Sequence, residues 1–223
     1  MLSSILKTML KRDEAGQAQA PAKPSSFLPT YEERYAPHLL GRTDGFRIMF
    51  RELEARLARR PGPALIVETG SLRTPGEWLD GQSTLLWAEF AKVHPCEIHT
   101  VDLNPDAAVT VRQTCGDAVH AHTGDSVAFL HRMACAPQPR QIDLLYLDSF
   151  DLDKEDPFPS AFHHMKELTS ARPCIGPGTI IAVDDNLVLP DGQYGGKGYL
   201  VMQWFRHLEI ECLHSGYQWI WRF

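Results

Sequence analysis

From residue 64 onward, short apolar runs alternate with longer amphipathic stretches. The apolar runs predict five strands, at 64–70 (ALIVETG), 97–104 (EIHTVDLN), 119–125 (VHAHTGD), 142–148 (IDLLYLD) and 178–185 (GTIIAVDD). Apolar residues at helical spacing predict the helices between them, near 82–93, 105–114, 126–134 and 159–170. Because four strand–helix units follow one another, we expect a parallel sheet with helices on both faces.

The last part of the chain predicts a different kind of pairing. A fifth helix is expected near 198–208, and IECLHSGYQWIWRF (210–223) contains two strand-like runs around Ser215-Gly216. These runs would close the sheet with an antiparallel hairpin at its edge. The predicted fold class is therefore α/β, with a seven-stranded, mostly parallel sheet that ends in a C-terminal antiparallel hairpin.

The first 62 residues follow another pattern. MLSSILKTMLKR (1–12) places apolar residues opposite basic ones, which predicts an interfacial anchor, or a helix that frays or docks on a partner. Residues 13–30 are polar and rich in Ala and Pro, as in a linker. Apolar residues at three- and four-residue steps over 31–60 predict one or two amphipathic helices, ended by Pro61-Gly62-Pro63. We expect three parts: an N-terminal helix with a flexible linker (1–30), a helical cap (31–62) and a main domain (63–223).

Composition narrows the class of protein. A chain of 223 residues that is 43% hydrophobic predicts one domain with a hydrophobic core, or one such domain with a short appendage. With 22 basic against 28 acidic residues, no broad cationic face is available for nucleic acid as the main partner. No apolar run approaches the roughly 20 residues of a membrane-spanning helix. Five cysteines without a C-x-x-C pair predict reduced thiols in a cytoplasmic protein.

Acidic residues stand at the end of every predicted parallel strand. In an open sheet of this kind, ligands bind beyond the carboxyl ends of the strands. Carboxylates crowded on one rim repel one another unless something bridges or neutralises them. The pattern therefore predicts a ligand or cation site formed by Glu68, Asp102, Asp125, Asp148, Asp184 and Asp185.

The segment after the first strand is rich in features that suit a ligand. Gly70 closes that strand, and Gly76 and Gly81 precede the predicted helix at Ser83-Thr84. Glycine lets a ligand approach the backbone, and Ser83 or Thr84 could cap a helix whose first N–H groups favour a carboxylate or phosphate. A plain turn is the alternative. The absence of a G-x-G-x-x-G fingerprint argues against a nicotinamide or flavin cofactor.

Taken in order, the motifs E-x-G, V-D-L-N, G-D-S and L-D-S resemble those of the class I S-adenosylmethionine-dependent methyltransferases, over roughly residues 63–223. The resemblance implies a Rossmann-like fold and S-adenosylmethionine as cofactor. It implies Glu68 and Gly70 near the methionine part, Asp102 at the ribose, and Asp125 and Ser126 at the adenine. We also expect Gly81, Ser83 and Asp148 to bind the cofactor. The stretch SLRTPGEWLD (71–80) is longer than the usual glycine loop and makes Arg73 a candidate for the cofactor's carboxylate.

A narrower resemblance concerns the acids after the fourth and fifth strands. Asp148 and Asp184-Asp185-Asn186 are similar to the metal-binding acids of catechol-type and macrocin-type O-methyltransferases. The resemblance implies Mg²⁺ held by Asp148, Asp184 and Asp185, or by Asp148, Asp185 and Asn186. A cluster with no Lys or Arg nearby in sequence favours a cation, and a metal-free turn is the alternative.

The resulting hypothesis is a Mg²⁺-assisted O-methyltransferase of a small hydroxylated molecule such as a sugar, a phenol or a natural product. A homo-oligomer is compatible with it. Catalytic candidates are Asp148 and, as proton acceptor, Asp151 or one of His163 and His164. The loop 192–198 would be a lid, with Tyr194 and Lys197 on the substrate, or a plain linker. Alternative functions are a nucleotide-dependent oxidoreductase or hydroxylase-like enzyme, and a non-catalytic binding subunit.

Overall fold

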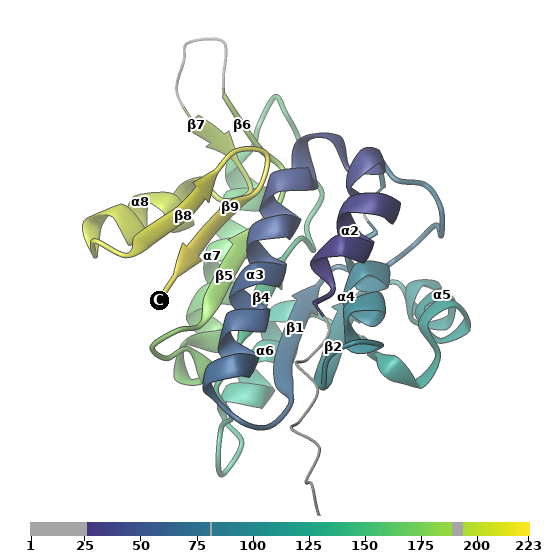
Figure 1. Ribbon diagram of the computed structural model, residues 1–223. Helices are drawn as coiled ribbons and strands as arrows, with labels where there is room; N and C mark the ends of the chain where they lie inside the picture. Colours follow the sequence, from purple (N-terminus) through teal and green to yellow (C-terminus); the bar gives the residue numbers. More distant parts are fainter. Residues whose placement is uncertain (1–25, 81, 189–193) are drawn as a thin grey trace, which may run out of the picture.

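A seven-stranded sheet forms the centre of the protein (Figure 1). The computed structural model describes residues 26–80, 82–188 and 194–223. The strands lie in the order β3-β2-β1-β4-β5-β9-β8. Their bounds are β1 Ala64–Thr69, β2 Cys96–Asp102, β3 His120–Thr123, β4 Leu144–Leu147, β5 Ile180–Val183, β8 Glu211–Ser215 and β9 Trp219–Arg222.

Five neighbouring strands pair in parallel, and the two pairings at the other end of the sheet are antiparallel. β1 pairs in parallel with β2 and with β4, while β9 runs antiparallel to both β5 and β8. The predicted fold class is confirmed, including the antiparallel hairpin around Ser215. The carboxyl ends of β1, β2, β4 and β5 consequently meet at one edge of the sheet.

Helices cover both faces of the sheet. In Figure 1, α2, α3 and α4 lie in front of it, and α6 and α7 lie behind. The helices are α2 Leu28–Arg34, α3 Thr43–Arg59, α4 Ser83–Ala91, α5 Pro105–Cys115, α6 Ser126–Ala134, α7 Phe158–Ala171 and α8 Tyr199–His207. Short 3₁₀ turns are η1 Ala36–His38, η2 Leu40–Arg42, η3 Gly116–Ala118 and η4 Arg172–Cys174.

Alternate residues of the central strands belong to two separate hydrophobic clusters. In β1, Ile66 packs into the cluster beneath α3 and α4, while Leu65 and Val67 belong to the cluster beneath α6, α7 and α8. Successive side chains of a strand point to opposite faces, so a strand covered on both sides is apolar throughout. All six residues of β1 are buried for this reason.

Two predicted boundaries need correction. Phe27 is 1% exposed and α2 begins at Leu28, so the linker expected to extend to residue 30 ends earlier. The segment 192–198, expected as a lid or linker, includes strand β7 (Tyr194–Gly196), which pairs antiparallel with β6 (Asn186–Val188) just before that segment. Residues 1–25, including the expected N-terminal helix, and residues 189–193 lie outside the described residues.

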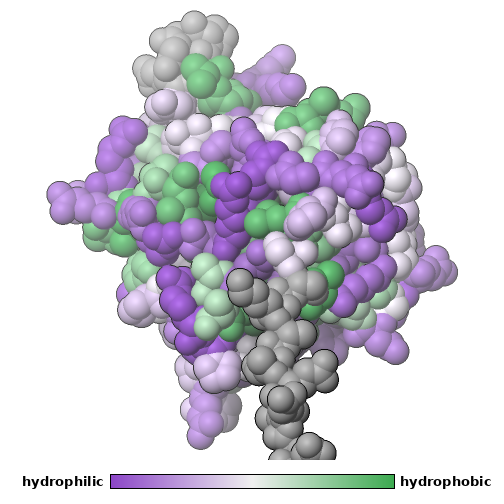
Figure 2. Space-filling view, viewed as in Figure 1, coloured by the Kyte–Doolittle hydropathy of each residue, from purple (hydrophilic) through white to green (hydrophobic). Residues whose placement is uncertain are grey.

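The surface of the described part is mixed in character. Hydrophilic residues are interspersed with smaller hydrophobic areas on the face seen in Figure 2. Among the residues that the structure describes, every helix is too short or too polar to traverse a lipid bilayer. All five cysteines are free.

Candidate functional site

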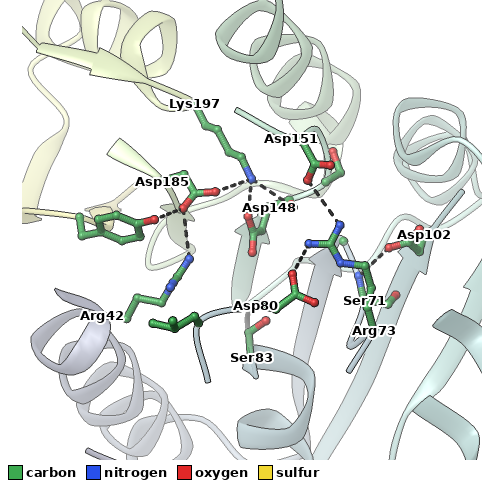
Figure 3. A pocket seen from close by; sticks show the side chains of 14 residues that line it. Arg42, Ser71, Arg73, Asp80, Ser83, Asp102, Asp148, Asp151, Asp185 and Lys197 are labelled. Atoms are coloured by element: carbon green, nitrogen blue, oxygen red, sulfur yellow. Dashed lines mark hydrogen bonds and ion pairs between the residues drawn. The ribbon is translucent and has the colours of Figure 1, made fainter. Parts of the chain in front are cut away.

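A cavity of about 160 Å³ lies at the edge where the parallel strands end (Figure 3). It is lined by Arg42, Gly70, Ser71, Arg73, Leu79, Asp80, Ser83, Asp102, Asp148, Ser149, Asp151, Asp185, Lys197 and Tyr217. Gly70, Arg73, Ser83, Asp102, Asp148, Asp151 and Asp185 are among the residues that the sequence singled out. The expected convergence of strand ends on one site is therefore confirmed for these side chains.

Gly70 is required by the geometry of this edge. Its φ of +83° lies in the left-handed region, and a Cβ atom there would stand 2.5 Å from the carbonyl oxygen of Asp148. The Gly70 N–H donates to the carbonyl of Val101 at 2.9 Å. Glycine thus lets the ends of β1, β2 and β4 approach one another beside the cavity.

Asp102 stands where β2 ends and faces the cavity. Its Oδ2 accepts a hydrogen bond from the Ser71 N–H at 3.0 Å, and its Oδ1 accepts one from the Asn104 N–H at 2.8 Å. These bonds fix the carboxylate while leaving each oxygen a further lone pair. Asp102 also lines an adjoining hollow of about 60 Å³.

That second hollow gathers the residues expected at an adenine ring. Asp125, Ser126, Phe150 and His163 line it together with Asp102. Asp125 also caps α6, because its Oδ1 accepts from the Ala128 N–H at 2.7 Å. The two hollows share Asp102 and Ser149, so they form one continuous surface along the strand ends.

Glu68 does not line the cavity, contrary to expectation. It is fully buried and accepts hydrogen bonds from the Thr84 hydroxyl at 2.5 Å and the Trp87 indole N–H at 3.0 Å. Burial raises the pKa of Glu68, and the donors around it oppose that rise. Its side chain therefore anchors the first turn of α4 from below, while Ser83 of the same turn faces the cavity. Gly81 lies outside the described residues.

Arg73 bridges two acids at the mouth of the cavity. Its guanidinium contacts Asp80 Oδ1 at 2.6 Å and Asp151 Oδ1 at 3.4 Å. The side chains of Arg73 and Asp151 are 47% and 83% exposed, so this pairing is open to water and to exchange for another carboxylate. Figure 3 shows Arg73 between its two partners.

The three acids after β4 and β5 do converge. Asp148, Asp184 and Asp185 each offer a carboxylate oxygen within 4.8 Å of the others. The alternative set with Asn186 is wrong, because the amide of Asn186 is used by the chain itself. Its Nδ2 donates to the Val183 carbonyl and its Oδ1 accepts from the Gly198 N–H, both at 2.8 Å.

Two basic side chains lie within the acid cluster: Arg42, which the sequence did not single out, and Lys197, which was expected as a substrate contact and not as a partner of the acids. Arg42 donates from Nε to Asp184 Oδ2 at 2.7 Å and contacts Asp185 Oδ1 at 3.1 Å. Lys197 Nζ lies 2.6 Å from Asp148 Oδ1 and 2.9 Å from Asp185 Oδ2. The expectation of a cluster without nearby basic groups is therefore wrong, since it counted neighbours in sequence and not in space.

The charges in this cluster shift one another's ionisation. Burial raises the pKa of Asp148 and of Asp184. Burial would also raise the pKa of Asp185, but Lys197, the Tyr217 hydroxyl and Arg42 together hold it below its usual value. For Lys197 the neighbouring Asp148 and Asp185 outweigh burial, and its pKa is raised.

The residues do not fit a divalent metal ion in this arrangement. Four oxygens of the three carboxylates already accept charged hydrogen bonds from Arg42 or Lys197. Mg²⁺ would need such oxygens at about 2.0–2.1 Å in octahedral geometry. Asp184 Oδ1 is buried without a hydrogen-bond partner, yet its residue is fully buried and does not line the cavity. The three carboxylates alone resemble a metal site, but the positive charges of Arg42 and Lys197 beside them oppose the binding of a cation.

Neither histidine reaches the acid cluster as a proton acceptor. His164 is fully buried, its Nδ1 lies 2.7 Å from the Ser160 carbonyl, and burial lowers its pKa to about 4. His163 lines the second hollow, with Nε2 3.1 Å from the Ser126 hydroxyl and 3.3 Å from Glu167 Oε1. Of the three proton-acceptor candidates, Asp151 lines the cavity that holds the acids.

A more voluminous hollow, of about 540 Å³, lies away from these groups. It is formed between α7, α8 and the end of β9 by mainly apolar residues such as Leu168, Phe205 and Phe223. Arg172 is the charged residue in its wall. It lacks the convergent polar groups of a reaction site, so we assign the candidate site to the smaller polar cavity.

Known proteins match this chain by structure. No protein-family model and no curated protein matches it by sequence. The MycE methyltransferase from the mycinamycin biosynthetic pathway, solved with Mg and SAH, has a TM-score of 0.52 at 15% identity, covering 81% of this chain and 49% of that one. CalS11, a TDP-rhamnose 3'-O-methyltransferase of calicheamicin biosynthesis, has a TM-score of 0.51 at 16% identity, covering 99% and 92%. The chain spans about half the length of MycE, and at these identities the likeness is one of fold.

Proposed function

Because the chain has the Rossmann-like fold of the class I S-adenosylmethionine-dependent methyltransferases, we propose that it transfers the methyl group of S-adenosylmethionine to a hydroxyl oxygen of a small molecule. The observation that carries this proposal is that the two hollows adjoin along the strand ends. Together they lead from Asp125 and Asp102 past Gly70 to Asp148 and Asp185. A nucleotide and a second reactant can therefore lie end to end along the same strand ends.

S-adenosylmethionine would lie along the carboxyl ends of neighbouring strands. Asp102 has lone pairs free for the two ribose hydroxyls, and the second hollow, with Asp125 and Ser126, would take the adenine. The methionine part would lie over the backbone at Gly70 and near Ser83. Its carboxylate would replace Asp80 or Asp151 on the guanidinium of Arg73.

The acceptor would lie beside the acid cluster. Methyl transfer joins the acceptor oxygen to the methyl carbon while the carbon–sulfur bond breaks, and its electron pair neutralises the sulfonium. The hydroxyl proton has to leave, and Asp151 is the exposed carboxylate in the cavity wall that can accept it. Alignment of the two reactants would supply much of the rate enhancement.

The magnesium ion expected from the sequence is not part of this proposal. Arg42 and Lys197 already pair with four of the six oxygens of the three carboxylates. The charged groups around Asp148 and Asp185 favour a polar acceptor that can exchange hydrogen bonds with them.

Calorimetry with S-adenosylmethionine tests the proposal directly. We expect one binding site in the wild type and a loss of at least about tenfold in affinity for Asp102→Ala, equivalent to about 1.4 kcal/mol. Asp106→Ala is the matched control, because Asp106 lies in the first turn of α5, four residues after Asp102, and lines neither hollow. A wild-type protein that binds no S-adenosylmethionine refutes the proposal.

A further inference from the structure

The acid cluster already contains a positive charge between two of its carboxylates. Lys197 Nζ lies 2.6 Å from Asp148 Oδ1, 2.9 Å from Asp185 Oδ2 and 3.5 Å from the Asp148 carbonyl oxygen. An ammonium group has three N–H donors, and these three acceptors can use all of them. We infer that Lys197 is the resident cation of this cluster: its ammonium group takes the place of a divalent ion, and the site works without a metal.

The fold holds Lys197 in this position. Its side chain is 2% exposed, although it follows a surface hairpin. Gly196 has a φ of +93°, and a Cβ atom there would collide with the Asp185 carbonyl oxygen. A Cβ atom on Gly198 would lie 2.5 Å from Asn186 Oδ1, which accepts the Gly198 N–H. The two glycines thus let the backbone run against Asp185 and Asn186, which directs the ammonium into the cluster.

Arg42 pairs with two further oxygens of the cluster. It contacts Asp184 Oδ2 at 2.7 Å and Asp185 Oδ1 at 3.1 Å, and its guanidinium carbon lies 4.6 Å from the centre of the Tyr217 ring. Both oxygens of Asp185 are therefore paired, each with a different base. A dication would have to displace these groups from the oxygens that they use. If both bases stayed beside it, the net charge of the five side chains would change from negative to positive.

One consequence rests on the proposed function: methyl transfer would proceed in the presence of a chelator. The occupancy of the cluster itself does not depend on that proposal, because it concerns these five side chains alone. The test therefore measures metal binding apart from the reaction. Mn²⁺ serves as the probe, since the electron paramagnetic resonance signal of the free ion falls when it binds.

The experiment compares three folded, metal-stripped proteins: the wild type, Lys197→Met and Lys92→Met. Methionine is close to lysine in length but lacks the ammonium. Lys92 is the matched control, because it also pairs with an acid, Glu89, but at the surface far from the cavity lining. We expect the wild type and Lys92→Met to bind Mn²⁺ more weakly than about 1 mM, and Lys197→Met to bind one ion at least about tenfold more tightly.

Two results would overturn the inference. One is a wild type that binds a single Mn²⁺ ion in the micromolar range, a measurement that needs no variant. The other is a Lys197→Met protein that gains no Mn²⁺ affinity, with Lys197→Gln as a second variant in case the first does not fold. Calorimetry with S-adenosylmethionine on the same samples separates the two proposals: a wild type that binds neither ligand refutes the methyltransferase and supports the resident lysine.

Discussion

Arg42 and Asp184 form a buried ion pair across 142 positions of sequence, with Nε 2.7 Å from Oδ2. Asp184 is fully buried, and its second oxygen has no hydrogen-bond partner. The pair joins the short turn η2 before α3 to the carboxyl end of β5. The helices that precede the sheet are thereby fixed to the rim of the cavity.

Replacing Arg42 should lower the stability of the fold. Arg42→Met leaves the Asp184 carboxylate buried without its partner, and we expect a loss of about 3 kcal/mol in the free energy of unfolding. Urea denaturation provides the measurement. Arg47→Met is the control, because Arg47 pairs with Glu32 and Asp44 at the surface and should cost less than about 1 kcal/mol. Equal losses in the two variants would contradict the prediction, and adding Asp184→Asn to Arg42→Met should restore part of the stability.

Gly70→Ala should damage both stability and cofactor binding. Gly62 has a similar φ of +97° but no atom within 4 Å of an added Cβ, whereas at Gly70 the Asp148 carbonyl oxygen lies 2.5 Å away. Gly62→Ala is the control, because alanine in the left-handed region costs about 1–2 kcal/mol at either position. The affinity for S-adenosylmethionine should fall at least about tenfold for Gly70→Ala alone. Calorimetry on both proteins checks this, and unchanged affinity in Gly70→Ala would speak against a cofactor over this backbone.

Acidic pH should lower the free energy of unfolding through the protonation of His164. Burial lowers the pKa of His164 to about 4 in the folded protein, below the value of about 6.5 of an exposed histidine. Between these values the unfolded chain binds a proton that the folded protein does not. The stabilising contribution is thus complete above pH 6.5 and is lost as the pH falls toward 4, by about 3 kcal/mol.

Urea denaturation at pH 7 and at pH 4.5 measures this loss. His164→Gln has no imidazole to protonate, so its stability should depend less steeply on pH over this range. Glu167 is also buried beside it with a lowered pKa, which leaves a residual loss on acidification in both proteins. Identical pH dependence in the wild type and His164→Gln would show that His164 does not contribute.

The order of strands and helices could be predicted because it depends on local apolar periodicity. The meeting of Asp148 with Asp184 and Asp185 was also predictable, since β4 and β5 are adjacent strands that end at the same edge. Arg42 was not placed there, because it precedes α3, and Lys197 was expected only as a substrate contact on a lid. Nothing in the spacing of residues along the chain indicates that the segment before α3 returns to this edge or that Lys197 pairs with the acids.

Glu68 shows a second limit of sequence reasoning. An acid near the end of a strand resembles a rim residue when only its position is counted. In β1 both faces are covered, so a side chain one residue before the strand's end still points into the core. The signal that could have indicated this was the partner set Thr84 and Trp87, which lies on the next helix at a spacing that puts both on its inner side.

The position of β9 between β5 and β8 constrains how the chain can assemble as it is synthesised. β8 leaves the ribosome before β9 but has no neighbour in the sheet until β9 has emerged and inserted beside β5. Sequential growth of the sheet from its first strands outward is therefore interrupted at this point. During that interval the open edge of β5 is exposed to pairing with other chains, and this stage is where we expect nascent protein to depend most on chaperones.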